Sequence, residues 1–347
     1  ESYIRSWQME PLPIATLAGL TPADVHIRFF DDRMEAIDYD APTDVVAIPV
    51  ETYTAKRAYQ IASRYRQRGV PVILGGFHAT LMPEEAMRFG DAVVTGEAEA
   101  IWAQVMDDAR HRTLQRRYHG ERLDLSTIRV DHRVFAGKRY LPIGLIETGR
   151  GCRFSCEFCA VQTFFGRTHR TRPVDIVLAE LHTLRGSKKL FFFVDDNFAG
   201  DMPAARELLH ALATTQAPGL RWVTQLSIHA AHDEAFVAAL ARAGCRGVLI
   251  GFESLDARNL RLMHKQFNTM KSGYIGALAH LRKHRIGVYG TGSILETVVG
   301  PSGELVYLGV RFSRHVTVRQ LRSGKRIPWC DEYNRMSSVL LAPDRPD

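Results

Sequence analysis

The sequence is poor in cysteine and has no long apolar run. Only five of its 347 residues are cysteines, and none precedes Cys152. This scarcity excludes a disulfide scaffold and favours a reducing compartment, which we expect to be the cytoplasm. The densest apolar run, 190–194, is far shorter than the roughly 20 residues that cross a bilayer. The apolar share of 46% and the charged share of 24% predict an ordinary globular chain, long enough for two domains.

The charge distribution lacks the mixture of aromatic and basic residues that is typical of nucleic-acid binding. The net charge of +7 comes from an excess of arginine, and nucleic acid is therefore not expected as a partner. One basic cluster, 110–117, is expected to be a solvated face. A second, made of Arg167, Arg170 and Arg172, either orders the neighbouring loop or binds an anionic substrate.

Three of the five cysteines lie together, and they are the most informative residues present. Cys152, Cys156 and Cys159 have C-x3-C-x2-C spacing directly after an expected apolar strand at 142–146. Thiolates are the usual ligands of a [4Fe–4S] cluster, and three of them leave one iron open to a reactant. A structural zinc site is the alternative. It is disfavoured because zinc needs a fourth ligand, whereas Cys245 and Cys330 are distant and His169 lies in an arginine-rich turn.

Residues 1–117 alternate short apolar strands with helices. We expect strands at 25–30, 45–49, 72–74 and 92–94, and helices at 54–69 and ending at 109. This order predicts a Rossmann-like, doubly wound parallel sheet that binds ligands at the carboxyl ends of its strands. The turns at Gly75-Gly76 and Thr95-Gly96-Glu97 would lie on that edge. The chain begins at Glu1, and its first clear strand stands where a second is expected, so we expect an N-terminal piece of this domain to be missing.

Residues 118–141 are polar and irregular and are predicted to be a linker. From 142 to 290, strand and helix alternate about every 30 residues, which predicts a (βα) barrel. Its five expected strands are 142–146, 190–194, 221–226, 247–250 and 286–289. Beyond Gly290 the pattern fails, and 291–347 is expected to be a divergent tail of unknown structure. A change of reading frame near Tyr289 or Gly290 is our preferred hypothesis for it.

The cysteine segment resembles the cluster loop of radical S-adenosylmethionine (radical SAM) enzymes. The whole chain resembles their subgroup with an N-terminal cobalamin-binding-type domain, through Gly75-Gly76-x-His78-x-Thr80, a following Pro-Glu-Glu, and Gly96-Glu97-x-Glu. The resemblance implies a partial (βα)6 barrel, and the failed pattern beyond Gly290 leaves open whether its last strand is present here. It implies a [4Fe–4S] cluster that cleaves SAM to a 5′-deoxyadenosyl radical, which then modifies an unactivated carbon. Methylation through cobalamin, a small-molecule or lipid substrate, and flavodoxin or ferredoxin as electron donor are further implications.

The resemblance also implies which residues contact SAM. They are expected at the third cysteine and at the carboxyl ends of the barrel strands: Phe158, Asp195, Asp196, Asn197, Gln225, Ser227, Glu253 and Ser254. Packing in the core for Phe158, and ordinary hydrogen bonding in the barrel mouth for the others, remain alternatives. Lys265 and Asn268 belong to a segment that resembles the family's but has no assigned role.

The implied cobalamin contacts are Gly75, Gly76, His78, Thr80, Gly96 and Glu97. The Asp-x-His-x-x-Gly motif that supplies a cobalt-ligating histidine in many cobalamin domains is missing, because Asp24-Val25-His26 lacks the glycine and begins an expected strand. Whether cobalamin binds is therefore open, and His78 either faces the corrin or is a polar turn residue.

Two other functions remain as alternatives. One is a truncated or frame-shifted relative that binds cluster, SAM or cobalamin without turnover, which the unusual tail keeps open. The other is an RNA- or protein-modifying methylthiotransferase. That class carries three additional cysteines in its N-terminal domain, and this chain has none before Cys152.

Overall fold

The computed structural model describes residues 9–215, 219–254, 256–269, 273–292, 296–299, 305–311 and 315–320. The chain divides into two compact units. The first comprises Glu1–Cys152 and Ala160–Lys189, and the second comprises Arg153–Cys159 and Leu190–Asp347. No helix in the described ranges is both long and apolar enough to cross a membrane.

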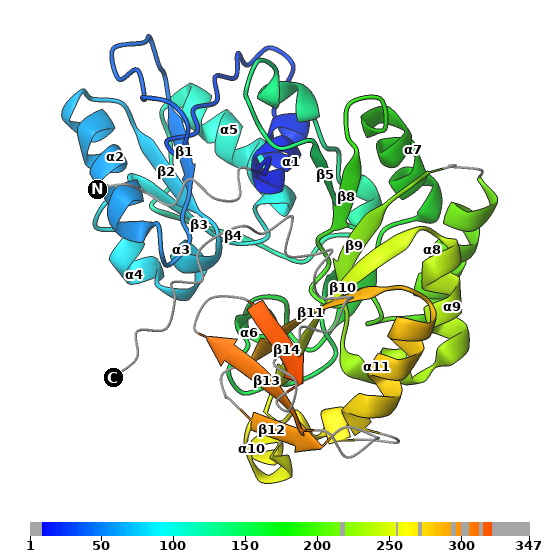
Figure 1. Ribbon diagram of the computed structural model, residues 1–347. Helices are drawn as coiled ribbons and strands as arrows, with labels where there is room; N and C mark the ends of the chain where they lie inside the picture. Colours follow the sequence, from blue (N-terminus) through cyan, green and yellow to red (C-terminus); the bar gives the residue numbers. More distant parts are fainter. Residues whose placement is uncertain are drawn as a thin grey trace. The chain divides into compact units, whose positions relative to one another are not determined.

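The first unit contains a four-stranded sheet in the order β1-β2-β3-β4, with every neighbouring pair parallel (Figure 1). The strands are β1 (Val46–Pro49), β2 (Val72–Gly75), β3 (Ala92–Gly96) and β4 (Arg117–Gly120). The helices of this part are α1 (Leu12–Leu20), α2 (Ala55–Gln67), α3 (Phe77–Leu81), α4 (Pro83–Ala86) and α5 (Trp102–His111), with a short 3-10 turn at Ala98–Ala100. The doubly wound parallel sheet that the sequence predicted is confirmed.

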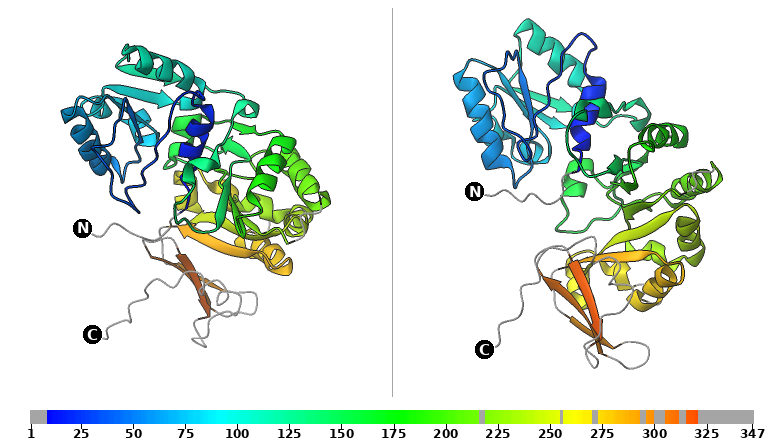
Figure 2. Two further views of the ribbon diagram at one scale, coloured as in Figure 1. Left: turned by 90° about the horizontal axis from the view of Figure 1, so that it is seen from above. Right: turned by 45° about the horizontal axis from the view of Figure 1, so that its top comes forward.

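Each face of this sheet has its own helices (Figure 2). Val72, Leu74 and Val93 pack with α2, whereas Ile73 and Val94 pack with α5. Successive side chains of a strand point to opposite faces, so apolar runs such as these are buried on both sides. The sheet is therefore covered on both faces, and only its edges and strand ends can receive a ligand.

The expected strand at 25–30 is wrong. These residues form no ladder, and Ile27 is 41% exposed. Their alternating apolar side chains contact other segments instead: Val25 packs against the α5 cluster, and the ring of Phe29 meets that of Phe135 edge-on. Conversely, the stretch 118–141 is not irregular throughout, since β4 begins at Arg117 and pairs with β3.

The rest of the first unit leads to and from the cysteine segment. Its elements are two 3-10 turns at Leu125–Thr127 and His132–Phe135, β5 (Ile143–Ile146), β6 (Gly149–Gly151), α6 (Ala160–Phe165), β7 (His169–Thr171) and α7 (Val174–Leu184). The strands β6 and β7 pair antiparallel, with Arg150 opposite Arg170. This two-stranded ribbon brings together the chain that enters the cysteine segment and the chain that leaves it.

The second unit contains four parallel strands in the order β8-β9-β10-β11, connected by helices (Figure 1). The elements are β8 (Leu190–Phe193), α8 (Met202–Thr214), β9 (Trp222–Gln225), a 3-10 turn at Ile228–His232, α9 (Glu234–Arg242), β10 (Cys245–Glu253), α10 (Ala257–Leu262), a 3-10 turn at Gln266–Thr269, α11 (Gly273–Lys283) and β11 (Gly287–Gly292). Asp201 and Asp233 begin α8 and α9 by accepting the backbone N–H groups of Ala204 and Phe236. Trp222 and Phe193 are fully buried and stack with centroids 4.5 Å apart.

A separate antiparallel sheet follows, formed by β12 (Glu296–Val299), β13 (Leu305–Arg311) and β14 (His315–Gln320). These strands do not join the parallel sheet. Within the described ranges, the last barrel strand that the family resemblance implied therefore does not follow β11. The remainder of the predicted tail, 321–347, with Cys330, lies outside the described residues.

Candidate functional site

The three-cysteine segment begins directly after β6. Cys152 is half-buried, Cys156 is buried, and Cys159 is half-buried, with its N–H donating to the Cys156 carbonyl at 3.1 Å. Gly151 has φ +89°, and a Cβ there would lie 2.3 Å from the Thr168 carbonyl oxygen, so only glycine fits. Across the described ranges, no three His, Cys, Asp or Glu side chains are arranged as a metal site. The three cysteines are therefore indicated as cluster ligands by their C-x3-C-x2-C spacing and by the chemistry of their thiols.

Within the second unit, residues 153–159 are held by the segment that follows β10. The ring of Phe154 stacks on that of Phe267 with centroids 3.9 Å apart, and the Glu157 N–H donates to the Met263 carbonyl at 3.1 Å. Phe158 lies 5.5 Å beneath the Lys265 ammonium. The segment with Lys265 and Asn268, whose role the sequence left open, thus supports the cysteine segment.

A pocket of about 430 Å³ lies beside this segment and is lined by Glu157, Phe158, Glu253, Leu262 and Met263. Phe158 is 55% exposed, so it lies outside the core. The lining combines an exposed aromatic ring and aliphatic side chains with two carboxylates. Such a surface suits a ligand that has both a flat ring and hydroxyl groups.

Glu253 ends β10 in an unusual backbone conformation. Its φ is +60°, and the pairing register with β11 shifts between Gly251 and Glu253. The carboxylate accepts the Lys265 ammonium at 2.9 Å, and Lys265 is only 9% exposed. Asn268, fully buried, donates to the carbonyls of Gly251 and Phe252 at 3.1 and 3.0 Å. These contacts hold a glutamate in the left-handed region, where it lines the pocket.

The carboxyl ends of β8 and β9 form a second polar group. Asn197, 3% exposed, accepts the N–H and the hydroxyl of Ser227 at 3.2 and 3.0 Å. Gln225 donates to the Asp195 carbonyl at 3.1 Å, and Asp195 is 1% exposed. The structure therefore brings four of the predicted residues together as two hydrogen-bonded pairs at neighbouring strand ends. It adds His229, whose Nδ1 lies 2.9 Å from the Ser227 hydroxyl and which the sequence reasoning missed.

Glu253 and Ser254 are adjacent to this arrangement in the same sheet but have other partners. The Ser254 hydroxyl accepts the Asp256 N–H at 3.0 Å, and the Tyr274 hydroxyl donates to the Ser254 carbonyl at 2.7 Å. Asp196 is half-buried. All the predicted SAM contacts thus lie in the second unit, on the cysteine segment or at the carboxyl ends of β8, β9 and β10.

In the first unit, the predicted cobalamin residues gather at the carboxyl edge of the β1–β4 sheet. His78 is 7% exposed, with Nδ1 3.3 Å from the Thr52 hydroxyl and Nε2 3.2 Å from Glu85. Both ring nitrogens thus have protein partners, which fits a turn histidine better than a cobalt ligand. The Gly96 N–H donates to Thr80 at 3.1 Å, which ties the β2 and β3 turns together.

Two glycines of this edge are required by the backbone. Gly76 has φ +92°, and a Cβ there would lie 3.1 Å from the Val50 backbone; Gly96 has φ +73°, and a Cβ would lie 2.3 Å from the Gly120 oxygen. Such turns let a flat ligand approach the main chain closely. The edge therefore fits a large planar group through its backbone and does not offer a ligating side chain at His78.

The arginines after the cysteine segment order the first unit. Arg170 donates to the Leu123 carbonyl at 2.8 Å and forms two hydrogen bonds with Glu97. Arg172, 5% exposed, reaches the Glu147 carbonyl at 2.8 Å and Glu180 at 2.7 Å. The ordering role is thus supported for both, while Arg167 is exposed.

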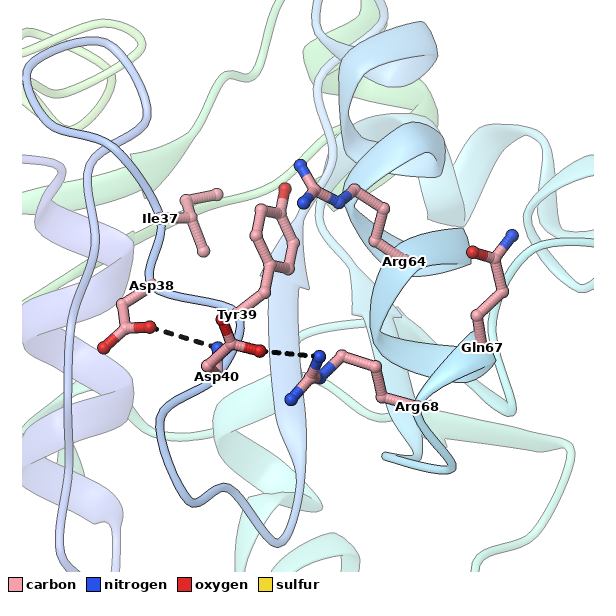
Figure 3. A pocket seen from close by; sticks show the side chains of 7 residues that line it. All are labelled: Ile37, Asp38, Tyr39, Asp40, Arg64, Gln67 and Arg68. Carbon is pink, nitrogen blue, oxygen red and sulfur yellow. Dashed lines mark hydrogen bonds and ion pairs between the residues drawn. The ribbon is translucent and has the colours of Figure 1, made fainter.

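A pocket of about 370 Å³ also opens in the first unit (Figure 3). Its charged residues already have partners within the protein: Arg68 pairs with Asp40 at 2.7 Å, Asp38 accepts the Asp40 N–H at 3.0 Å, and the Arg64 guanidinium lies 3.7 Å from the centre of the Tyr39 ring. Arg64 and Arg68 belong to the end of α2, which leads to the amino end of β2. The pocket is therefore at the wrong end of a parallel sheet for a cofactor.

Two family models match separate parts of this chain. Residues 146–302 match the Radical SAM superfamily, and residues 8–105 match the B12 binding domain. The chain thus contains a radical SAM domain preceded by a B12-binding domain. These two domains imply a [4Fe–4S] cluster, SAM and cobalamin as cofactors, and the three thiols are a fitting donor set for the first of them.

Curated relatives resemble most of this chain. Bacteriochlorophyllide d C-12(1)-methyltransferase of Chlorobaculum tepidum is 32% identical over 292 residues, which is 81% of this chain and 63% of that protein. Hopanoid C-2 methylase of Rhodopseudomonas palustris is 26% identical over 76% of this chain and 52% of its own length. The chain thus spans roughly half to two thirds of these relatives.

Solved structures share the fold at low identity. The radical SAM methyltransferase TsrM of Kitasatospora setae, with cobalamin and a [4Fe–4S] cluster bound, has a TM-score of 0.57 at 17% identity, covering 73% of this chain and 58% of that one. The cobalamin-dependent radical SAM enzyme OxsB, with aqua-cobalamin bound, has a TM-score of 0.58 at 15% identity, over 73% and 41%. The predicted combination of a Rossmann-like domain with a radical SAM barrel is confirmed.

Proposed function

We propose that this protein is a cobalamin-dependent radical SAM methyltransferase. The observation that carries the proposal is the presence in one chain of a B12-binding domain and of a radical SAM domain with Cys152, Cys156 and Cys159. When bound, the cluster, SAM and cobalamin supply the electron, the carbon radical and the methyl carrier. The relatives named as methyltransferases support methylation as the outcome.

The chain's own residues would bind and orient these groups. The three thiolates hold the cluster, and Phe158 offers a ring face beside the pocket. Glu253 is placed to accept hydrogen bonds from ligand hydroxyls there, while its charge is balanced by Lys265. Asp195, Asn197 and Ser227, at the carboxyl ends of β8 and β9, would bind the polar end of SAM.

The proposed substrate is a small molecule or lipid with an unactivated carbon. The relatives act, by their names, on a bacteriochlorophyllide and on a hopanoid. A low-potential protein such as flavodoxin or ferredoxin is the proposed electron donor, and the cytoplasm the proposed compartment. The scarcity of cysteine and the use of three thiolates as cluster ligands both suit a reducing environment.

Anaerobic reconstitution tests the proposal. The chain is loaded with iron, sulfide and hydroxocobalamin and incubated with dithionite and SAM that carries a labelled methyl group. We expect reductant-dependent 5′-deoxyadenosine and a change in the cobalamin absorbance. The matched variant Cys156→Ala should abolish deoxyadenosine. A reconstituted cluster without any deoxyadenosine would instead support a relative that binds its cofactors without turnover.

A further inference from the structure

The carboxyl edge of the β1–β4 sheet carries two turns that reach beyond the sheet. Phe77 directly follows Gly76 after β2, and Glu97 directly follows Gly96 after β3. Both glycines have positive φ, and a Cβ would lie 3.1 Å from the Val50 backbone at position 76 and 2.3 Å from the Gly120 oxygen at position 96. The backbone therefore fixes where Phe77 and Glu97 emerge, and both belong to the first unit along with the flanks of the cysteine segment.

Glu97 holds the flank before Cys152. It is 4% exposed and lies 3.2 Å from Nη1 of Arg150, which stands two residues before that cysteine. Arg150, 8% exposed, also binds Glu147 through two hydrogen bonds of 2.8 Å and Glu99 at 2.8 Å. Arg170 lies opposite Arg150 in the β6–β7 ribbon, and its guanidinium donates two hydrogen bonds to the same Glu97. One carboxylate thus fixes both strands of the ribbon.

Phe77 holds the flank after Cys159. Its ring stacks on that of Phe164 with centroids 4.2 Å apart and 19° between planes, and it meets Phe165 edge-on at 5.8 Å. Phe164 and Phe165 end α6, the helix that begins directly after Cys159. The Arg150 guanidinium lies 5.7 Å from the centre of the Phe165 ring, so the anchored residues of the two flanks also interact with each other.

We propose that Glu97 and Phe77 are positioning residues that anchor both flanks of the cysteine segment to the cofactor-binding edge of the B12-binding domain. The inference rests on the proposed function in taking this segment as the cluster site and this edge as the cobalamin site. Its content is separate: within the first unit, one buried carboxylate and one aromatic stack hold the chain before Cys152 and the chain after Cys159 to this edge. In this role Glu97 acts on the loop through Arg150 and Arg170 and does not serve as a cofactor ligand.

The types of contact suit positioning. Arginine presents a rigid fork of donors, so two guanidiniums on one carboxylate fix direction as well as distance. A stacked ring pair adds a second point of attachment on the other flank. A short segment that is fixed at both ends has far fewer conformations than one fixed at a single end. Loss of either anchor should therefore loosen the adjoining flank without removing a thiolate.

Amide hydrogen exchange on the whole chain without added cofactors tests this directly. Glu97→Gln keeps the shape but removes the charge, and should speed exchange in 147–152 and 169–172 by at least about tenfold. Phe77→Leu should do the same chiefly in 160–165. The control Glu84→Gln changes a carboxylate that is 76% exposed in the same domain. The control Phe89→Leu removes a ring stacked on Tyr59 at 4.0 Å in the α2 cluster. Neither should alter the flanks.

A spectroscopic readout separates positioning from general loss of stability. In reconstituted protein, iron and sulfide content should be unchanged in Glu97→Gln, because the thiolates remain. The electron paramagnetic resonance spectrum of the reduced cluster should broaden, since the loop then has several arrangements, and Glu97→Asp should restore part of the narrow spectrum.

The outcomes are separable. The inference would be overturned if the flanks of both variants exchanged their amide hydrogens at the wild-type rate. It would also be overturned if exchange in α2 increased as much as exchange in the flanks. An unchanged cluster spectrum in both variants would overturn it as well. If the wild-type chain takes up no iron and sulfide, the proposed function fails, whereas the exchange measurement still decides the anchoring. If Glu97→Gln does not fold, Phe77→Leu with its control decides alone.

Discussion

Glu97 in the first unit and Glu253 in the second are both carboxylates at the end of a parallel strand, and they are held differently. At the end of β3, Gly96 takes the positive φ of +73°, so Glu97 follows without strain. At the end of β10, Glu253 itself has φ +60°. Glu97 has two arginine partners, and Glu253 has a lysine.

The difference indicates different tasks. Two guanidinium forks leave Glu97 buried at 4% exposure with no room to move, which suits a structural anchor. A lysine is a flexible point charge, and Glu253 lines a pocket. A non-glycine residue in the left-handed region costs about 1–3 kcal/mol and tends to occur where a ligand is bound. Structure is thus expected to depend on the first glutamate and ligand binding on the second.

The largest effect on stability is expected from removing Arg150, the arginine that contacts Glu97, Glu99 and Glu147. Arg150→Leu leaves the buried Glu97 and the half-buried Glu99 and Glu147 with one compensating charge fewer, which should cost about 3–5 kcal/mol. Urea unfolding followed by intrinsic fluorescence measures the loss. The control is Arg66→Leu, whose pair with Asp91 is more than a third exposed and should contribute under about 1 kcal/mol. Equal losses in the two variants would contradict the anchoring role.

The next largest effect is expected at His132, a cation that lies beside two carboxylates and can lose its proton. His132 lies between Glu10 at 3.4 Å and Glu180 at 3.3 Å in the first unit. Burial opposes its charge, but the two glutamates prevail and raise its pKa from 6.5 to about 9. Because the folded-state pKa is the higher one, the stabilisation is complete below pH 6.5 and is lost as pH rises through 9.

This loss should reach up to about 3 kcal/mol between pH 6.5 and 9. Arg150 cannot supply such a slope, since its pKa is raised further by Glu147, Glu99 and Glu97 against the effect of burial. Unfolding free energies at five pH values measure it, and His132→Gln should flatten the curve. A curve with the same slope in that variant would assign the pH dependence to other groups.

The glycines of the two strand ends give the next contrast. A Cβ at position 96 would lie 2.3 Å from the Gly120 carbonyl oxygen, which is backbone, at a positive φ. A Cβ at position 251 would lie 2.5 Å from Glu253 Oε1 and 2.6 Å from Lys265 Nζ, which are flexible side-chain ends. Gly96→Ala should therefore cost about 1–3 kcal/mol, and Gly251→Ala about 1 kcal/mol or less.

Thermal unfolding of both alanine variants measures this contrast. Gly251→Ala should instead separate Glu253 from Lys265 and weaken SAM binding. If Gly251→Ala were the less stable variant, the backbone at position 96 would have to be more adaptable than its contacts indicate.

Much of this fold could be predicted from local patterns. The helix expected at 54–69 is α2, Ala55–Gln67, because Gly69, with φ +76°, marks where it ends. The strand expected at 25–30 failed because an alternating pattern does not show whether a partner strand exists, and these side chains pack on Phe135 and α5 instead. The short polar strand β4 was missed because only its pairing with β3 makes it a strand.

The site divides in the same way. Cysteine spacing is local and pointed to a cluster, and strand ends pointed to polar groups such as Asn197 and Ser227. Glu97 could be placed on the binding edge, but its partners could not be foreseen, because Arg150 is 53 residues away in the chain and Arg170 is 73. Likewise, the pairing of Lys265 with Glu253 depends on how the chain turns after β10 and not on either residue's neighbours.

The smallest effect is expected at Lys265, where it sharpens the contrast most. Lys265 neutralises Glu253 at 2.9 Å and lies over the Phe158 ring, so Lys265→Met should let both side chains turn away from the pocket. We expect SAM affinity of the reconstituted protein to fall about fivefold, which corresponds to about 1 kcal/mol. Lys265→Arg keeps the charge and should stay within about twofold of wild type. Lys283→Met, at an exposed pair with Glu234, is the control. If Lys265→Met lowered the unfolding midpoint but bound SAM normally, Glu253 would be a structural anchor like Glu97, and the two strand ends would no longer differ in task.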